Sequence, residues 1–180
     1  MERLDITREL RDEHDLILEW VYLIEELARR SEGSFEESPL AEHFPVVDEF
    51  LGTYSDTFHH AKEEDILFGI LERVITHCGP IPVMLHEHAI GRALRARMGE
   101  AFRARDLETL LGASRDFCGL LTQHIAKENN VLYPMAEQSV PDEERRAIQE
   151  AYAAAALRHD ARALRERFER ERDTLRAKLG

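Results

Sequence analysis

An internal repeat constrains the fold of this chain more than any other feature of its sequence. The stretch HHAKEEDILF begins at His59, and the stretch HIAKENNVLYP begins at His124. Aligning them places His59 on His124 and Glu63 on Glu128, so each copy carries a histidine and a glutamate four residues apart. In an α-helix that spacing projects both side chains from one face, about one turn apart. The repeat therefore predicts two helices that each offer an imidazole and a carboxylate to one centre.

One HxxxE motif alone would be weak support for a metal site. The chain has 36 acidic residues among 180, so chance puts an acid four positions after a histidine about one time in five. Its repetition strengthens the case. Imidazole and carboxylate ligands suit iron or manganese and also tolerate zinc. Two bridging carboxylates favour a site with two metal ions.

The first copy leaves a choice of register. His59 with Glu63 and His60 with Glu64 both have the four-residue spacing, and the apolar centre of this helix falls between them. We choose His59 and Glu63 because the repeat aligns them with the second copy. His60 is kept as a further candidate, either as a ligand or as a residue that orients one. We expect that replacing Glu64 by alanine lowers the amount of metal bound per chain only slightly.

Apolar residues recur at helical spacing along the chain, and no alternating β-branched run of strand length appears. The pattern predicts helices over residues 5–30, from Pro45 to about Val74, from Pro82 to 103–105, and from a cap at Asp106 onward. The expected inner faces of the third and fourth helices are Val83, Met84, Ile90, Leu94 and Met98, then Leu110, Phe117, Leu120, Leu121, Val131 and Met135. Four such helices predict an all-α, up-down antiparallel four-helix bundle over residues 1–137.

Residues 138–180 are predicted to form an additional C-terminal helix. Its apolar stripe is thin and consists of Ile148, Tyr152, Leu157, Leu164, Phe168 and Leu175. This stripe either packs across the bundle or forms the seam of a homodimer.

The remaining histidines can be sorted by the helix faces on which they fall. His14 lies in the apolar stripe of the first helix, and His88 follows Met84 by one turn on the third, so both are predicted ligands. His86 points nearly opposite and is expected to be solvated. Glu87 is kept as a candidate acceptor behind a ligand. His43, His77 and His159 are expected at the surface.

Composition narrows the class of protein. The formal net charge is −12, which opposes binding to nucleic acid or to an anionic membrane. There is no apolar run of bilayer-spanning length and no start that resembles a signal peptide, so we expect a cytoplasmic protein. Cys78 and Cys118 lie far apart and are expected to be reduced and buried.

Four segments, in order, resemble the ligand-bearing segments of the hemerythrin-like, or HHE cation-binding, family. They are RDEHDLIL around His14, HHAKEEDILF, VMLHEHAIGR around His88, and HIAKENNVLYP. Members of that family bind a non-heme di-iron centre inside an up-down four-helix bundle. A ferritin-like site would instead carry ExxH motifs, whereas the order here is HxxxE.

The resemblance implies two iron ions joined by an oxo or hydroxo bridge, with manganese or zinc as substitutes. It implies terminal ligands and two bridging carboxylates at His14, His59, His88, His124, Glu63 and Glu128. Oxygen-carrying hemerythrins have a histidine where this chain has Arg92 and an aspartate where it has Asn129. Simple oxygen carriage is therefore disfavoured. The chain is more similar to members proposed to act on peroxide, nitric oxide or iron.

The leading prediction is a di-iron protein that binds or reacts with O2, H2O2 or NO. No catalytic residue separate from the metal ligands is needed. If the protein is an enzyme, it would be a di-iron oxidoreductase, such as one that decomposes peroxide. The alternatives are an iron or gas sensor or iron-handling protein without turnover, including the repair-of-iron-centre type, and an interaction protein in which the metal is a structural staple.

Overall fold

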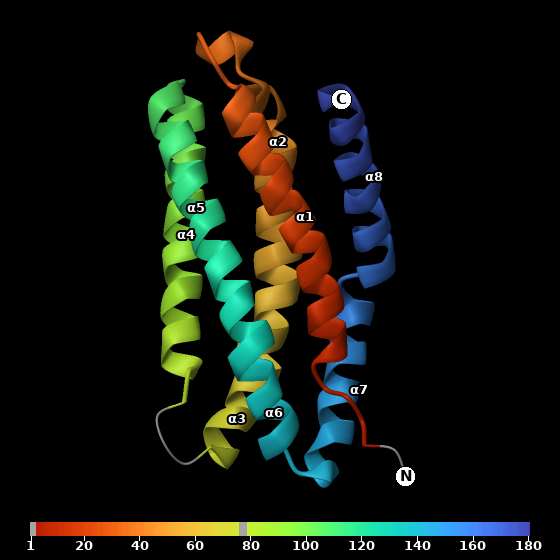
Figure 1. The fold of residues 1–180 in the computed structure, drawn as a ribbon. Coiled ribbons are helices and arrows are strands. Elements are labelled where there is room, and N and C mark those ends of the chain that lie inside the picture. Colours follow the sequence, from red (N-terminus) through yellow and green to blue (C-terminus); the bar gives the residue numbers. More distant parts are fainter. Residues whose placement is uncertain (1–2, 76–78) are drawn as a thin grey trace.

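The computed structural model describes residues 3–75 and 79–180, and within these residues it is helical with no strand (Figure 1). The prediction of an all-α fold is confirmed. His77 and Cys78 lie outside the described residues. The elements in chain order are α1 (Arg8–Arg30), η1 (Phe35–Glu37), α2 (Pro39–Phe50), η2 (Leu51–His60), η3 (Glu63–Phe68), α3 (Gly69–Val74), α4 (Ile81–Ala104), α5 (Leu107–Lys127), η4 (Glu128–Leu132), α6 (Tyr133–Ser139), α7 (Asp142–Arg158) and α8 (Ala161–Leu179).

Helix α1 lies in the middle of the molecule, in contact with α2, α5 and α8 (Figure 1). Its predicted inner stripe is buried, from Leu10 through His14 and Ile17 to Ile24. Because these residues recur every three or four positions, one face of the helix stays in the core over its whole length.

The segment that carries the first repeat is one unbroken run of helix, residues 39–74. It begins at Pro39, not at Pro45 as expected. Ser38 caps it, because its Oγ accepts the backbone N–H of Ala41 at 3.1 Å, and Pro39 occupies the first turn, where no N–H is needed. Pro45 lies inside α2 on the exposed side.

Helices α4 and α5 lie against each other and are joined by a tight turn (Figure 1). The cap at Asp106 is confirmed, since its Oδ1 accepts the backbone N–H of Thr109 at 3.0 Å. Two residues of the expected inner face of α4 are exposed, Val83 by 50% and Ile90 by 36%. In Figure 1 α4 lies at the edge of the molecule, so only a narrow stripe of it is covered.

The second repeat continues from α5 through η4 into α6. The η4 turn is of the wide π type, in which backbone hydrogen bonds span five residues. The extra residue in the turn shifts the inward face, so Val131, expected inside, is 48% exposed, whereas Leu132 and Tyr133 are fully buried. The matching residues of the first repeat, Leu67 and Phe68, are buried in the same way.

After residue 141 the chain forms two helices where one was expected. The break falls at Asp160, whose φ of 45° is left-handed, and α7 and α8 flank it. Phe168 of α8 is fully buried, with its ring 5.9 Å from that of Trp20 and 5.1 Å from that of Phe50. Leu157 is 84% exposed. Much of the thin apolar stripe therefore packs against other parts of the same chain, and the homodimer stays a prediction.

The buried apolar residues form two clusters along the helix axes. One contains Ile17, Phe58 and Leu121, and the other contains Leu10 and Leu132. Helices α1 and α4 and the two helical runs that carry the repeats pass from one cluster to the other through a short polar stretch. Among the described residues, each helix is too short or too polar to span a lipid bilayer.

Candidate metal centre

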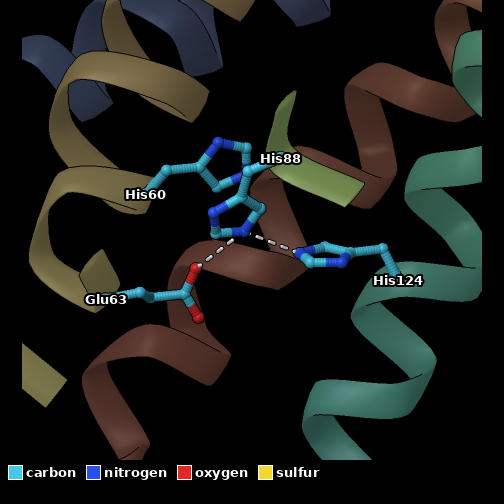
Figure 2. Close-up of side chains that lie close together, drawn as sticks. All are labelled: His60, Glu63, His88 and His124. Atoms are coloured by element: carbon cyan, nitrogen blue, oxygen red, sulfur yellow. Dashed lines mark hydrogen bonds and ion pairs between the residues drawn. The ribbon is translucent and has the colours of Figure 1, made fainter. Parts of the chain in front are cut away.

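Two groups of buried side chains lie between the apolar clusters, and each could hold a metal ion. Within each group, one ligand atom per residue lies within 4.8 Å of the others. The first position consists of His14, His59, Glu63 and Glu128. The second position consists of His60, Glu63, His88 and His124, whose side chains gather around one point in Figure 2. Because Glu63 belongs to both groups, its carboxylate stands between the two positions.

The two repeats supply most of these side chains. His59 Nε2 lies 3.6 Å from Glu63 Oε2, and His124 Nε2 lies 3.2 Å from Glu128 Oε1. Helices α1 and α4 add one histidine each. All six residues predicted as ligands are therefore brought together, each no more than 2% exposed: His14, His59, Glu63, His88, His124 and Glu128.

His60, the further candidate of the first repeat, also faces the site. His59 is 1% exposed and His60 is 7% exposed. The η2 segment consists of wide π-type turns, which contain more residues per turn than an α-helix. Neighbouring residues are then separated by a smaller angle, so both rings face inward and the two registers are not exclusive.

The five histidines share one orientation: Nδ1 faces an oxygen acceptor. The Nδ1–O distances are 3.0 Å from His14 to Asn129, 2.8 Å from His59 to Glu13, 3.5 Å from His60 to Asp56, 2.7 Å from His88 to Glu64, and 3.0 Å from His124 to Glu87. An acceptor behind Nδ1 fixes the ring and leaves Nε2 as the free donor atom, as at histidine–metal sites in proteins.

Cationic side chains hold most of these acceptors in place. Lys62, only 1% exposed, contacts Glu13, and Lys127 contacts Glu87. Arg92 donates to Asp56 and Glu64 at 2.7 and 2.6 Å. Sequence reasoning anticipated only Glu87 among the acceptors. Glu13 could have been found from the sequence, because it is an acidic residue on a face of the first helix that is otherwise buried.

Several buried polar atoms at the centre form no hydrogen bond. They are His59 Nε2, His60 Nδ1, Glu63 Oε2 and both carboxylate oxygens of Glu128. His88 Nε2 and His124 Nε2 lie only 2.9 Å apart. Buried polar atoms without partners are costly, whereas cations at the two positions would satisfy those of His59, Glu63 and Glu128. The residues present therefore fit a metal centre of nitrogen and oxygen ligands.

Burial and neighbouring charges set the ionisation of the site. Burial raises the pKa of Glu63 well above its usual value, and the adjacent Glu128 adds to this rise. Burial also acts on Glu128, but the imidazoles of His124 and His14 outweigh it and hold the pKa of that carboxyl well below its usual range. Burial lowers the pKa of His88 to about 2. His88 is therefore neutral at physiological pH, the form that binds metal.

Tyr133 is a further polar residue that sequence reasoning missed. Its hydroxyl donates to Glu63 Oε1 at 2.6 Å, and its ring stacks on His14 with centroids 5.4 Å apart. The repeat aligns Tyr133 with Phe68, which stacks on His88 with centroids 5.9 Å apart. The alignment of the two repeats could have indicated that an aromatic ring stacks on a histidine at both of these places. The hydroxyl makes the first position differ from the second.

A pocket reaches the second position from the surface. Its lining includes His60, His88 and His124, together with apolar side chains such as Phe117 and Leu120. Gly91 also lines it, and a Cβ at Gly91 would lie 3.9 Å from both apolar side chains. The pocket is narrow and its exposed surface is mostly apolar, which suits a small molecule.

The other histidines that the structure describes lie outside the two positions. His86 is exposed, as expected from the α4 face on which it falls. His43 and His159 are half-buried. Cys118 is buried and unoxidised, and burial raises the pKa of its thiol.

Comparison with known proteins gives one finding. The family model described as "Hemerythrin HHE cation binding domain" matches residues 5–136. No curated protein and no solved structure gives a significant match to the chain. The matched range contains both copies of the repeat and every residue of the two positions.

Proposed function

This chain belongs to the hemerythrin HHE cation-binding domain family, and on that premise we propose that it is a di-iron protein that binds or reacts with a small oxidant: O2, H2O2 or NO. The observation that carries the proposal is the shared orientation of the buried histidines, with Nδ1 against an acceptor and Nε2 toward two glutamates. The proposed ligands of the two irons are His14, His59, Glu63, His88, His124 and Glu128.

The choice of iron rests on the mixture of donor atoms. Imidazole suits iron, zinc and copper, whereas carboxylate favours harder cations, so a mixed set accommodates iron or manganese and tolerates zinc. When bound, iron would supply one-electron chemistry that no side chain at the site can provide. The residues of this chain hold it and exclude bulk water by burial.

The small size of the proposed reactant rests on the pocket. Its walls include Phe117 and Leu120, and it ends at the histidines of the second position. A diatomic molecule or a peroxide fits such a channel, whereas a metabolite with a bulky ring system does not. Arg92 and Arg95 also line the pocket, where each is paired with an acid.

We also propose the finer architecture: an up-down antiparallel four-helix bundle over residues 1–137, followed by a helical extension over residues 138–180. Support comes from the contacts of α1 with α2 and α5 and of α4 with α5. The family match, which ends at residue 136, agrees with this division.

The test is metal analysis followed by optical spectroscopy. Purified protein is stripped of metal, reconstituted with ferrous iron without oxygen, and desalted, after which iron per chain is measured. We expect about two irons per chain and an absorption band that changes when peroxide is added. A chain that retains less than one iron, or whose spectrum is insensitive to peroxide, O2 and NO, would contradict the proposal.

Matched variants separate the ligands from other acidic and histidine residues. Glu128→Ala is expected to lose iron, because it removes the carboxylate that faces both His14 and His124. Asp65→Ala and His86→Ala change exposed residues close by and should retain the iron content of the unaltered chain. Equal losses in all three variants would indicate a general folding defect.

A sensor without turnover is the second candidate, and Lys62 favours it. This buried side chain contacts Glu13 behind His59, and its Nζ lies 5.4 Å from the ring centroid of Tyr152 on α7. Metal bound by His59 could therefore change the packing of the C-terminal helices. Limited proteolysis with and without metal tests this function, and an identical pattern of cleavage in α7 and α8 would exclude it.

A further inference from the structure

The two positions have different numbers of histidines. The first position contains His14 and His59, and the second contains His60, His88 and His124. The repeat and the family resemblance account for four of these five residues. His60 is the additional one, and it is buried beside the second position.

The ring of His60 packs closely on the other histidines of this group. Its centroid lies 3.9 Å from that of His88, with the planes 16° apart, and 6.0 Å from that of His124. A ligand atom of His60 lies within 4.8 Å of ligand atoms of Glu63 and both histidines. One ion among these atoms could be reached by all four side chains.

The surroundings of His60 resemble those of the other histidines in the site. Asp56 stands on its Nδ1 side at 3.5 Å, a longer distance than at the other four histidines and without a hydrogen bond, and Arg92 holds Asp56 at 2.7 Å. The same arginine holds Glu64, the acceptor behind His88. A histidine that only filled space would need neither an acceptor nor a cation behind that acceptor, whereas a metal-ligating histidine commonly has such support.

We propose that His60 is a ligand of the second metal, so that the two metals have two and three imidazole ligands. This inference rests on the proposed metal centre and adds a residue to it. The unequal ligand sets give the two positions different affinities.

The pocket determines which of the two metals a molecule from solvent reaches. His60 is part of the pocket wall, so the three-histidine metal is the one that a molecule from solvent meets first. Removal of the His60 ring would enlarge the pocket next to this metal. A free imidazole could then occupy the space and supply the missing nitrogen.

The test uses cobalt(II), whose visible bands report the number and type of ligands. Metal-free wild-type, His60→Ala, His60→Gln and His86→Ala proteins are titrated with cobalt without oxygen, and the circular dichroism of each is compared first. We expect wild type and His86→Ala to bind two equivalents with the same bands. In both His60 variants, one equivalent should bind at least about 10-fold more weakly with altered bands.

Imidazole addition is the decisive second measurement. It should restore the bands and the affinity of His60→Ala and leave wild type unchanged. Two equivalents bound with wild-type affinity and bands by His60→Ala would overturn the role of His60 and leave the metal centre intact. So would weakened binding that imidazole does not restore, because this would indicate a structural role. A wild-type chain that binds no cobalt or iron would overturn the metal centre and the inference together.

Discussion

Arg92 donates from Nη2 to Oε1 of Glu64 at 2.6 Å. The same oxygen lies 2.7 Å from Nδ1 of His88, and Nε of Arg92 donates to Asp56, behind His60. One guanidinium therefore holds the acceptors of two histidines. Arginine carries no lone pair for a metal, so at this place it orients the site where oxygen-carrying hemerythrins have a histidine.

Glu64→Ala is predicted to weaken metal binding at the second position by about 10- to 100-fold, the usual effect of removing an acceptor behind a ligating histidine. This revises the expectation from the sequence that Glu64 would matter little. Competition of the metal-loaded protein against a chelator measures the affinity. The control is Asp65→Ala, an exposed acid next in the chain. Equal affinity in the two variants would show that His88 does not need Glu64.

Arg92→Ala should act through the same histidines. Loss of the guanidinium frees Glu64 and Asp56 to move, so we predict about 10-fold weaker binding. The double variant with Glu64→Ala should lose less affinity than the sum of the two single losses, because both changes act on His88. Arg97→Ala, an exposed arginine of α4, is the control. If the losses of affinity in the two single variants add up in full in the double variant, Arg92 and Glu64 act independently.

The six predicted ligand residues could be found from the sequence because helical spacing and the internal repeat both point to them. The HxxxE spacing fixes the face of His124 and Glu128 within a single helix, and the stripe around His14 fixes its direction without knowledge of the partner helices. The α-helical period was not sufficient in α4, where Val83 and Ile90 are exposed because this helix lies at the edge of the molecule.

The other errors fall where the winding changes or where a partner comes from another helix. The π-type turns rotate Val131 outward and bring His60 inward, and a period of 3.6 residues cannot anticipate either. Glu13 is the acceptor of His59, 46 positions away. Such a contact depends on how α1 packs against η2, which no local pattern encodes.

Tyr133→Phe is predicted to destabilise the metal-free protein. The hydroxyl donates to Glu63 in a fully buried place, and its loss leaves a carboxylate oxygen without a partner, which costs about 1–3 kcal/mol. The variant makes the second repeat identical to the first at this position, where Phe68 stands. Urea unfolding in the presence of a chelator measures the change. Tyr22→Phe, at a residue 64% exposed, should change the free energy of unfolding by less than about 0.5 kcal/mol.

Phe168→Ala is predicted to lower the free energy of unfolding by about 3–5 kcal/mol, because it opens a cavity against Trp20 and Phe50. Leu157→Ala, at the exposed end of α7, should change it by less than about 0.5 kcal/mol. Urea unfolding at two protein concentrations measures both variants and also tests the dimer. Similar small effects of the two changes would mean that α8 does not pack on the rest of the chain in solution.

Gly91→Leu should block the pocket without disturbing the ligands. A Cβ at this position meets Leu120 and Phe117 at an ordinary contact distance of 3.9 Å, so the first carbon fits, and the rest of a leucine side chain would extend into the pocket. We predict that the iron-loaded variant keeps its metal content but binds azide at least about 10-fold more slowly in stopped-flow measurements.

Gly112→Leu on α5, where a Cβ meets no atom within 4 Å, is the matched control and should bind azide at the wild-type rate. An unchanged rate in Gly91→Leu would mean that small molecules reach the metals by another route, and loss of iron would mean that the leucine disturbs His88 or His124 directly.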